Sequence, residues 1–237
     1  MIAKISHTKF AKWFFSIFVC TFLIGTVFAQ TASETSYFNG GVKLISNNGT
    51  AGTIETQNPT IISGPSVSIW VMTCDSSGSS DSGYAQGGYR KISGNTYVNY
   101  FYEYNYDGDG TWYRKDFGTA TVGSHNDYMV GCDSTTMYFK INNTSYGTVS
   151  LSSIPFDRNT IEIEGETHHT DDQCPGSVSN PVTMGNAEYK STSNVWTSTT
   201  CTVNFSSIGT GYGGLSTMRN NISTSGSNDW EIWDSRY

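Results

Sequence analysis

The feature that most constrains the fold is a long series of short runs rich in Val, Ile, Thr, Tyr and Phe. Clusters of Gly, Asn, Asp and Ser separate these runs, and helical periodicity is almost absent. The runs predict strands at 41–46, 52–57, 66–74, 84–92, 96–105, 111–117, 126–132, 135–141, 145–151, 160–168, 185–191, 195–205 and 229–234. This pattern over roughly 200 residues predicts an all-β protein, a two-sheet antiparallel β-sandwich or jelly roll. Residues 206–228 are expected to form a long surface loop.

Residues 1–29 are expected to be a signal peptide and not part of the fold. Lys4, Lys9 and Lys12 form a basic region, and an apolar stretch of about sixteen residues follows, which is short for a membrane span. The segment 27–29, Val-Phe-Ala, is typical of a cleavage site. We therefore expect a secreted, extracellular mature chain, residues 30–237, that forms a single β-sandwich domain. A retained membrane anchor is the alternative.

The charge balance of the mature chain excludes some partners. The leader holds three of the 13 basic residues and none of the 20 acidic ones, so ten basic residues face twenty acidic ones after cleavage, a formal net charge of −10. Such a chain is not expected to bind nucleic acid or, once the leader is removed, an anionic membrane. The balance suits a protein that works in acid. A monomer is expected, and no cofactor.

Four cysteines remain after the leader is removed: Cys74, Cys132, Cys174 and Cys201. An even number of cysteines in an exported chain predicts two disulfides, for which three connectivities exist. Pairing of Cys74 with Cys132 and of Cys174 with Cys201 is preferred. A zinc site is the alternative, although no Cys-x-x-Cys pair is present.

Two segments carry polar residues in a pattern that suggests chemistry. Side chains alternate between faces along a strand, so Glu162, Glu164, Glu166 and His168 are expected to share one face of the strand at 160–168. Like charges at this spacing repel, and a purely solvated face usually mixes the signs. Gln86 lies in a second strand. A carboxylate that faces an amide across a cleft can supply both a general base and an oxyanion donor.

A succession of short motifs extends over about residues 37–170: Asn39-Gly40-Gly41, Ser68-Ile69-Trp70-Val71 before Cys74, Gln86-Gly87-Gly88, Gly94-Asn95-Thr96-Tyr97, Tyr100-Phe101-Tyr102-Glu103-Tyr104, and Glu162 with Glu166. Read in order, these motifs resemble those of the secreted glutamic peptidases called eqolisins and, more distantly, the plant neprosin-like peptidases. The family has Thr-Gly after its catalytic glutamine, whereas Gly87 and Gly88 follow Gln86 here. The resemblance implies a concanavalin-like sandwich with a Gln/Glu dyad on a concave face.

By motif position, the resemblance implies that Gln86 and Glu166 are the catalytic pair of an acid endopeptidase that hydrolyses polypeptides. Glu166 would take a proton from the attacking water and return it to the leaving amine, and Gln86 would stabilise the oxyanion. Repulsion from Glu162 and Glu164 would raise the pKa of Glu166. The residues expected to contact the substrate are Trp70, Tyr84, Phe101, Glu103, Glu162, Glu164 and His168.

Other sites remain as alternatives. A non-catalytic, lectin-like sandwich would bind a glycan or a peptide in an aromatic groove formed by Trp70, Tyr84, Phe101 and Trp112. The segment 105–110 resembles a calcium loop but lacks flanking helices, so a hairpin turn is favoured and no metal is expected. No Gly-x-Ser-x-Gly motif occurs, which disfavours a serine hydrolase of that kind.

Overall fold

The computed structural model describes residues 36–75, 83–105, 112–203 and 215–237. Within these residues the fold is all-β, and its one helical element is a single short 3-10 turn, η1, at Leu151–Ser153. The strands are β1 (Tyr37–Leu44), β2 (Gly49–Glu55), β3 (Ser66–Cys74), β4 (Tyr84–Ile92), β5 (Val98–Asn105), β6 (Trp112–Ala120), β7 (His125–Cys132), β8 (Thr136–Ile141), β9 (Thr144–Ser150), β10 (Thr160–Thr167), β11 (Val182–Lys190), β12 (Trp196–Ser198), β13 (Thr202–Val203), β14 (Met218–Asn220) and β15 (Trp230–Asp234). The predicted signal peptide lies outside the described residues, and no described helix is long and apolar enough to span a membrane.

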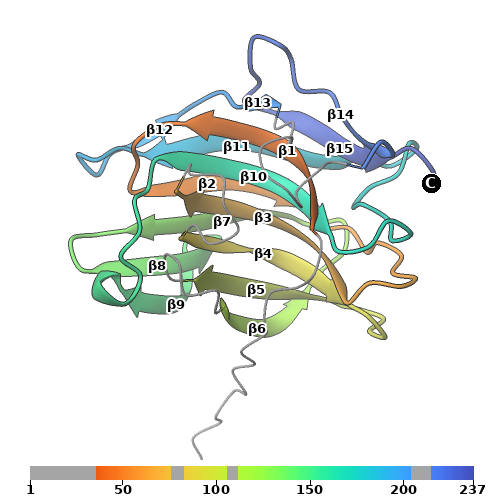
Figure 1. Ribbon diagram of the computed structural model, residues 1–237, viewed down its shortest axis with the longest axis horizontal. Coiled ribbons are helices and arrows are strands. Elements are labelled where there is room, and N and C mark those ends of the chain that lie inside the picture. The colour runs from red at the N-terminus through yellow and green to blue at the C-terminus, as the bar shows by residue number, and fades with distance from the viewer. Residues whose placement is uncertain (1–35, 76–82, 106–111, 204–214) are drawn as a thin grey trace, which may run out of the picture.

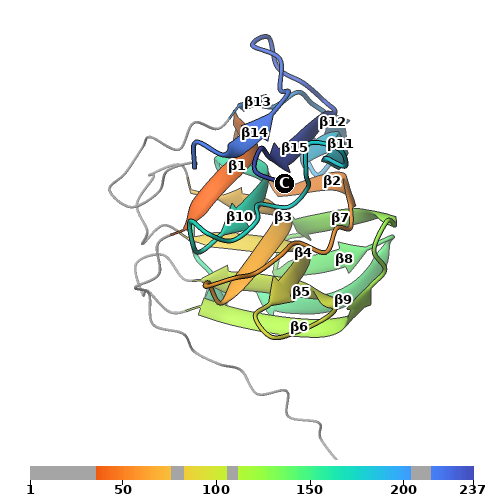
Figure 2. The same cartoon turned by 90° about the vertical axis from the view of Figure 1, so that its right-hand side faces the viewer.

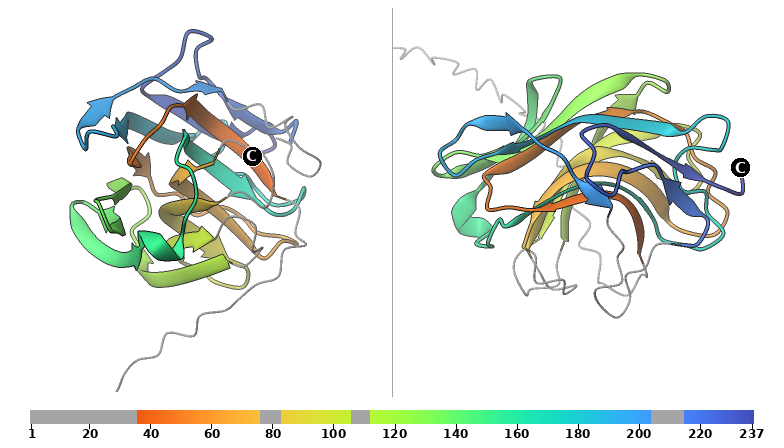
Figure 3. Two further views of the ribbon diagram at one scale, coloured as in Figure 1. Left: turned by 60° about the vertical axis from the view of Figure 1, so that its left-hand side comes forward. Right: turned by 90° about the horizontal axis from the view of Figure 1, so that it is seen from above.

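The strands form two antiparallel sheets that pack face to face (Figures 1 and 2). Among the described residues, one sheet has seven strands in the order β13-β1-β10-β3-β4-β5-β6, and the other has eight in the order β14-β15-β11-β2-β7-β8-β9, with β12 paired to β11. Figure 3 shows that the strands are arched in the view from above. The two-sheet antiparallel sandwich predicted from the sequence is confirmed.

The core lies between the sheets and is built from alternate residues of each strand. On β10, Ile161 and Ile163 are fully buried in this core, and Ile69 and Val71 of β3 lie beside them. Alternation therefore turns Glu162, Glu164 and Glu166 to the opposite, outer face of the seven-stranded sheet. The predicted common face of these three carboxylates is thus present.

The predicted strands agree with the structure best in the middle of the chain. The strands predicted at 66–74 and 84–92 coincide with β3 and β4. The strand predicted at 195–205 is two short strands, β12 and β13, and the predicted loop 206–228 contains β14. β14 escapes prediction because its three residues owe their conformation to pairing with β15 and not to a local pattern.

The structure contradicts the predicted disulfides. Cys74, Cys132, Cys174 and Cys201 are all buried free thiols. Cys74 ends β3 in the seven-stranded sheet, whereas Cys132 ends β7 in the other sheet. Cys174 follows β10, and Cys201 forms an isolated bridge with Ser227. An even number of cysteines carries no information on their separation in space, and here each cysteine is buried without a disulfide partner.

Candidate active site

Three successive rows of side chains cross the outer face of the seven-stranded sheet, because residues paired between neighbouring strands point to the same side. In the order β1, β10, β3, β4, β5, β6, the first row contains Val42, Glu162, Met72, Gln86, Glu103 and Arg114. The second row contains Gly40, Glu164, Trp70, Gly88, Phe101 and Asp116. The third row contains Phe38, Glu166, Ser68, Arg90, Asn99 and Thr119.

Gln86 is held in one orientation by its neighbour Glu103. Its amide Nε2 donates to Glu103 Oε1 over 3.2 Å, and the Tyr84 hydroxyl donates to the same oxygen over 2.5 Å. Arg114 binds the other carboxylate oxygen at 3.2 Å. An ionised carboxylate only accepts hydrogen bonds, so the NH₂ group of Gln86 must face Glu103. The amide therefore keeps a second N–H for another acceptor.

Tyr84 remains a donor in this network. Burial raises the pKa of the Tyr84 hydroxyl well above its usual range, and the negative charge of Glu103 raises it further. The Gln86 and Glu103 residues are only 6% and 7% exposed, which strengthens the electrostatic interactions between them.

Glu162 lies in the same row as Gln86, on the other side of Met72. Its Oε1 accepts a hydrogen bond from the Cys74 thiol, with 3.6 Å between the sulfur and the oxygen. Burial raises the pKa of Glu162 from its ordinary value of 4.5 to about 7, although the thiol hydrogen bond acts in the opposite direction. Burial, and then the charge of Glu162, raise the pKa of the Cys74 thiol well above its usual range, so it stays protonated and donates.

Glu166 occupies a different part of the face. Its Oε2 accepts hydrogen bonds from Ser68 Oγ and Trp70 Nε1, both at 3.1 Å, and its Oε1 lies 3.5 Å from His168 Nε2. Glu166 is four residues along β10 from Glu162, which corresponds to about 13 Å of extended strand. The structure therefore does not bring Glu166 opposite Gln86, and of the three carboxylates on β10 it is Glu162 that lies in the row of Gln86.

Three of the predicted substrate contacts are almost fully buried. Glu164, Trp70 and Phe101 are 0%, 1% and 2% exposed, and the Trp70 ring packs edge-on against Phe38 with 6.0 Å between centroids. These side chains form the floor of the face and support the residues beside them. Gly88 belongs to the same row, and a Cβ atom there would lie 1.9 Å from the Ile69 carbonyl oxygen, so only glycine fits where β4 approaches β3.

Several residues of the site were not singled out from the sequence. Arg90 makes a two-pronged ion pair with Asp116, at 2.5 and 2.7 Å, and Arg114 neutralises Glu103. Alternation along the strand predicted at 84–92 could have placed Arg90 on the face of Gln86. Its partner on β6 depends on strand pairing, which no local signal specifies.

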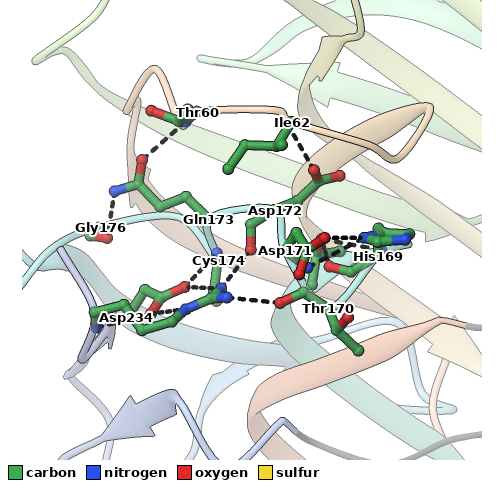
Figure 4. A network of polar contacts seen from close by, with 12 residues as sticks. Thr60, Ile62, His169, Thr170, Asp171, Asp172, Gln173, Cys174, Gly176 and Asp234 are labelled. Atoms are coloured by element: carbon green, nitrogen blue, oxygen red, sulfur yellow. Dashed lines mark hydrogen bonds and ion pairs between the residues drawn. The ribbon is translucent and has the colours of Figure 1, made fainter.

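The loop after β10 is tied down by a network of buried polar groups (Figure 4). Asp172 is fully buried, and its carboxylate accepts backbone N–H groups of Ile62, Ser63 and Gly64 at 2.7, 2.9 and 3.0 Å. The Cys174 N–H donates to the fully buried Asp234 over 3.1 Å. The network holds the end of β10, and with it Glu166, in place against the 60–64 loop.

The alternatives based on metals find no support in the described part of the chain. No group of three or more His, Cys, Asp or Glu side chains there could hold a metal ion. His168 turns to Glu166 and Ser36, whereas His169 lies 3.7 Å from Asp171. Most of the segment that resembles a calcium loop, 106–111, lies outside the described residues.

Comparison with known proteins gives the class of the fold. No family model and no curated protein matches the sequence. A crystal structure of Scytalido-glutamic peptidase with a peptide-based transition state analogue is similar at 15% identity and a TM-score of 0.53, over 86% of this chain and 100% of that one. SCP-B, an eqolisin family member in complex with the tripeptide Ala-Ile-His, is similar at 14% identity over the same shares, with a TM-score of 0.53.

The fold is thus the sandwich of the eqolisin glutamic peptidases, as the sequence motifs had suggested. The similarity covers the whole of both peptidase chains and 86% of this one. A Bacillus licheniformis β-glucanase is also similar, with a TM-score of 0.39 over 54% of this chain. That weaker likeness carries no argument about function.

Proposed function

We propose that this protein is a secreted peptidase of the glutamic type in which Glu162 activates water and Gln86 stabilises the oxyanion. The observation that carries the proposal is the common row of Glu162 and Gln86 on the outer face of the seven-stranded sheet. Two inter-strand spacings separate their backbones, about 10 Å, so a water molecule and a peptide carbonyl fit between the two side-chain ends when the side chain of the intervening strand turns aside.

The chemistry follows from the two side chains. Ionised Glu162 accepts a proton from water as the water oxygen bonds to the carbonyl carbon, and the carbonyl electron pair moves onto oxygen. The free N–H of Gln86 donates to that oxyanion. When the carbonyl re-forms, the C–N bond breaks and the proton held by Glu162 passes to the leaving nitrogen. The products are a carboxylic acid and an amine, and Glu162 is ionised again.

The raised pKa of Glu162 sets the expected pH dependence. The general base must be ionised in the free enzyme, and its pKa is about 7. We therefore expect kcat/KM to fall about tenfold for each pH unit below 7. An optimum near neutrality replaces the acid optimum that the composition suggested.

Two glutamine variants test whether the general base is Glu162 or Glu166, the residue that motif position favours. Hydrolysis of a quenched fluorescent peptide library between pH 3 and 8 is the assay. Glu162→Gln should remove turnover, Gln86→Ala should lower it by about 10²–10³, and Glu166→Gln should retain most of it. Glu188→Gln, on the eight-stranded sheet, is the matched control. If Glu166→Gln loses peptide hydrolysis while Glu162→Gln keeps full activity, the general base is Glu166 and not Glu162.

The lectin-like alternative is less well supported. Trp70 and Phe101 are almost fully buried and offer no exposed ring face on which a sugar could stack. If the wild type cleaves no peptide between pH 3 and 8 and binds a saccharide on a glycan array, the binding role takes the place of the peptidase role.

A further inference from the structure

Met72 lies between the two residues proposed to act on the substrate. It pairs with Glu162 on one side and with Gln86 on the other, so the three backbones occupy neighbouring strands in one row. Paired residues project to the same face, which places the Met72 side chain in the gap between the carboxylate and the amide. The attacking water and the peptide carbonyl would have to occupy this same gap.

The two flanking side chains are tethered. Glu162 accepts the Cys74 thiol, and Gln86 donates to Glu103. The Met72 backbone is also fixed, because its carbonyl accepts the Thr50 hydroxyl of the other sheet at 2.7 Å. The strand therefore cannot move aside easily, and opening of the gap must come from the Met72 side chain itself.

The chemistry of methionine suits this movement. The side chain is unbranched, with three rotatable bonds, and adapts to the space it is given. Met72 is partly exposed, whereas Ile161, Ile163 and Val71 behind it are fully buried in the core. Because Met72 lies on the opposite face of the sheet from these core residues, its rotation toward solvent does not require them to move.

We propose that the Met72 side chain is a gate that closes the space between Glu162 and Gln86 and swings out when a peptide binds. This inference rests on the proposed peptidase function. Only molecules whose Met72 side chain is turned out can then bind substrate. The apparent affinity is therefore the intrinsic affinity multiplied by the fraction of molecules in this open conformer. Shortening the side chain should remove this penalty, and a bulkier, stiffer side chain should increase it.

The test is a size series at position 72. Met72→Ala is expected to raise kcat/KM about five- to tenfold, mainly through a lower KM, as it would if the open conformer were populated at about 10–20%. Met72→Phe is expected to lower kcat/KM by at least as much. Val42→Ala is the matched control, because Val42 flanks Glu162 in the same row but on the side away from Gln86. It should leave kcat/KM unchanged.

A second measurement separates effects on folding from effects on the gate. Thermal unfolding of each variant identifies those that are folded at the assay temperature. Binding of the same peptide to Glu162→Gln and to Glu162→Gln/Met72→Ala, by calorimetry, should show the affinity gain without turnover.

The outcomes distinguish the two proposals. If the wild type cleaves peptides and folded Met72→Ala is no faster and binds no tighter, the gate is refuted and the peptidase role stands. Cleavage by Met72→Ala alone supports both. If neither protein cleaves or binds any peptide, the peptidase role fails, and the gate fails with it.

Discussion

Replacement of Glu162 by glutamine tests the central electrostatic claim without any assay of activity. In the folded protein, burial raises the pKa of Glu162 from 4.5 to about 7. Between these two values the folded state holds a proton that the unfolded chain releases, so the free energy of unfolding falls as pH rises. This decrease in the free energy of unfolding begins near pH 4.5 and is complete above about pH 7.

The magnitude follows from the displacement of the pKa. At about 1.4 kcal/mol per pH unit, a displacement from 4.5 to about 7 corresponds to about 3 kcal/mol. Glu162 is partly exposed by surface area, so this value is the upper end of what solvent screening allows. Glutamine has the same shape, stays neutral at every pH, and can still accept the Cys74 thiol.

Glu162→Gln should therefore match the wild type at pH 4 and exceed it by up to about 3 kcal/mol at pH 8. Urea unfolding followed by tryptophan fluorescence at intervals between pH 4 and 8 measures the difference. Because other titrating groups are common to both proteins, they cancel. Glu188→Gln controls for the loss of one negative charge. A difference between wild type and Glu162→Gln that stays constant from pH 4 to 8 would refute the reasoning.

Three further predictions concern the fold and the maturation of the chain. Asp172→Ala should lower the free energy of unfolding by about 3 kcal/mol, because three backbone N–H groups lose the fully buried carboxylate that accepts them; urea unfolding measures this, and a change below about 1 kcal/mol would contradict it. Alkylation without reductant should modify no cysteine in the native protein and four in the denatured mature chain, those being Cys74, Cys132, Cys174 and Cys201. Cysteines that still resist alkylation after denaturation would show that disulfides form. Amino-terminal sequencing of exported protein should begin at Gln30, and a start beyond about residue 35 would indicate a propeptide.

The sequence alone carries the layout of the strands and the faces of their side chains. The apolar alternation over 66–74 and 84–92 predicts β3 and β4 with their observed bounds. The same alternation places Glu162, Glu164 and Glu166 on one face and Ile161 and Ile163 on the other. These properties are local, because the two-residue period of a strand depends only on its own backbone. The succession of motifs also pointed to the eqolisin fold.

Only the tertiary structure decides which residues of different strands meet. The spacing of Glu162 and Glu166 leaves open which carboxylate lies level with Gln86, because a shift of the register by a few residues moves every partner along the strand. Packing of whole sheets also determines that Trp70 and Phe101 form a buried floor and that the four cysteines are buried as free thiols. Strand register and sheet packing are non-local, and together they place Met72 between Glu162 and Gln86.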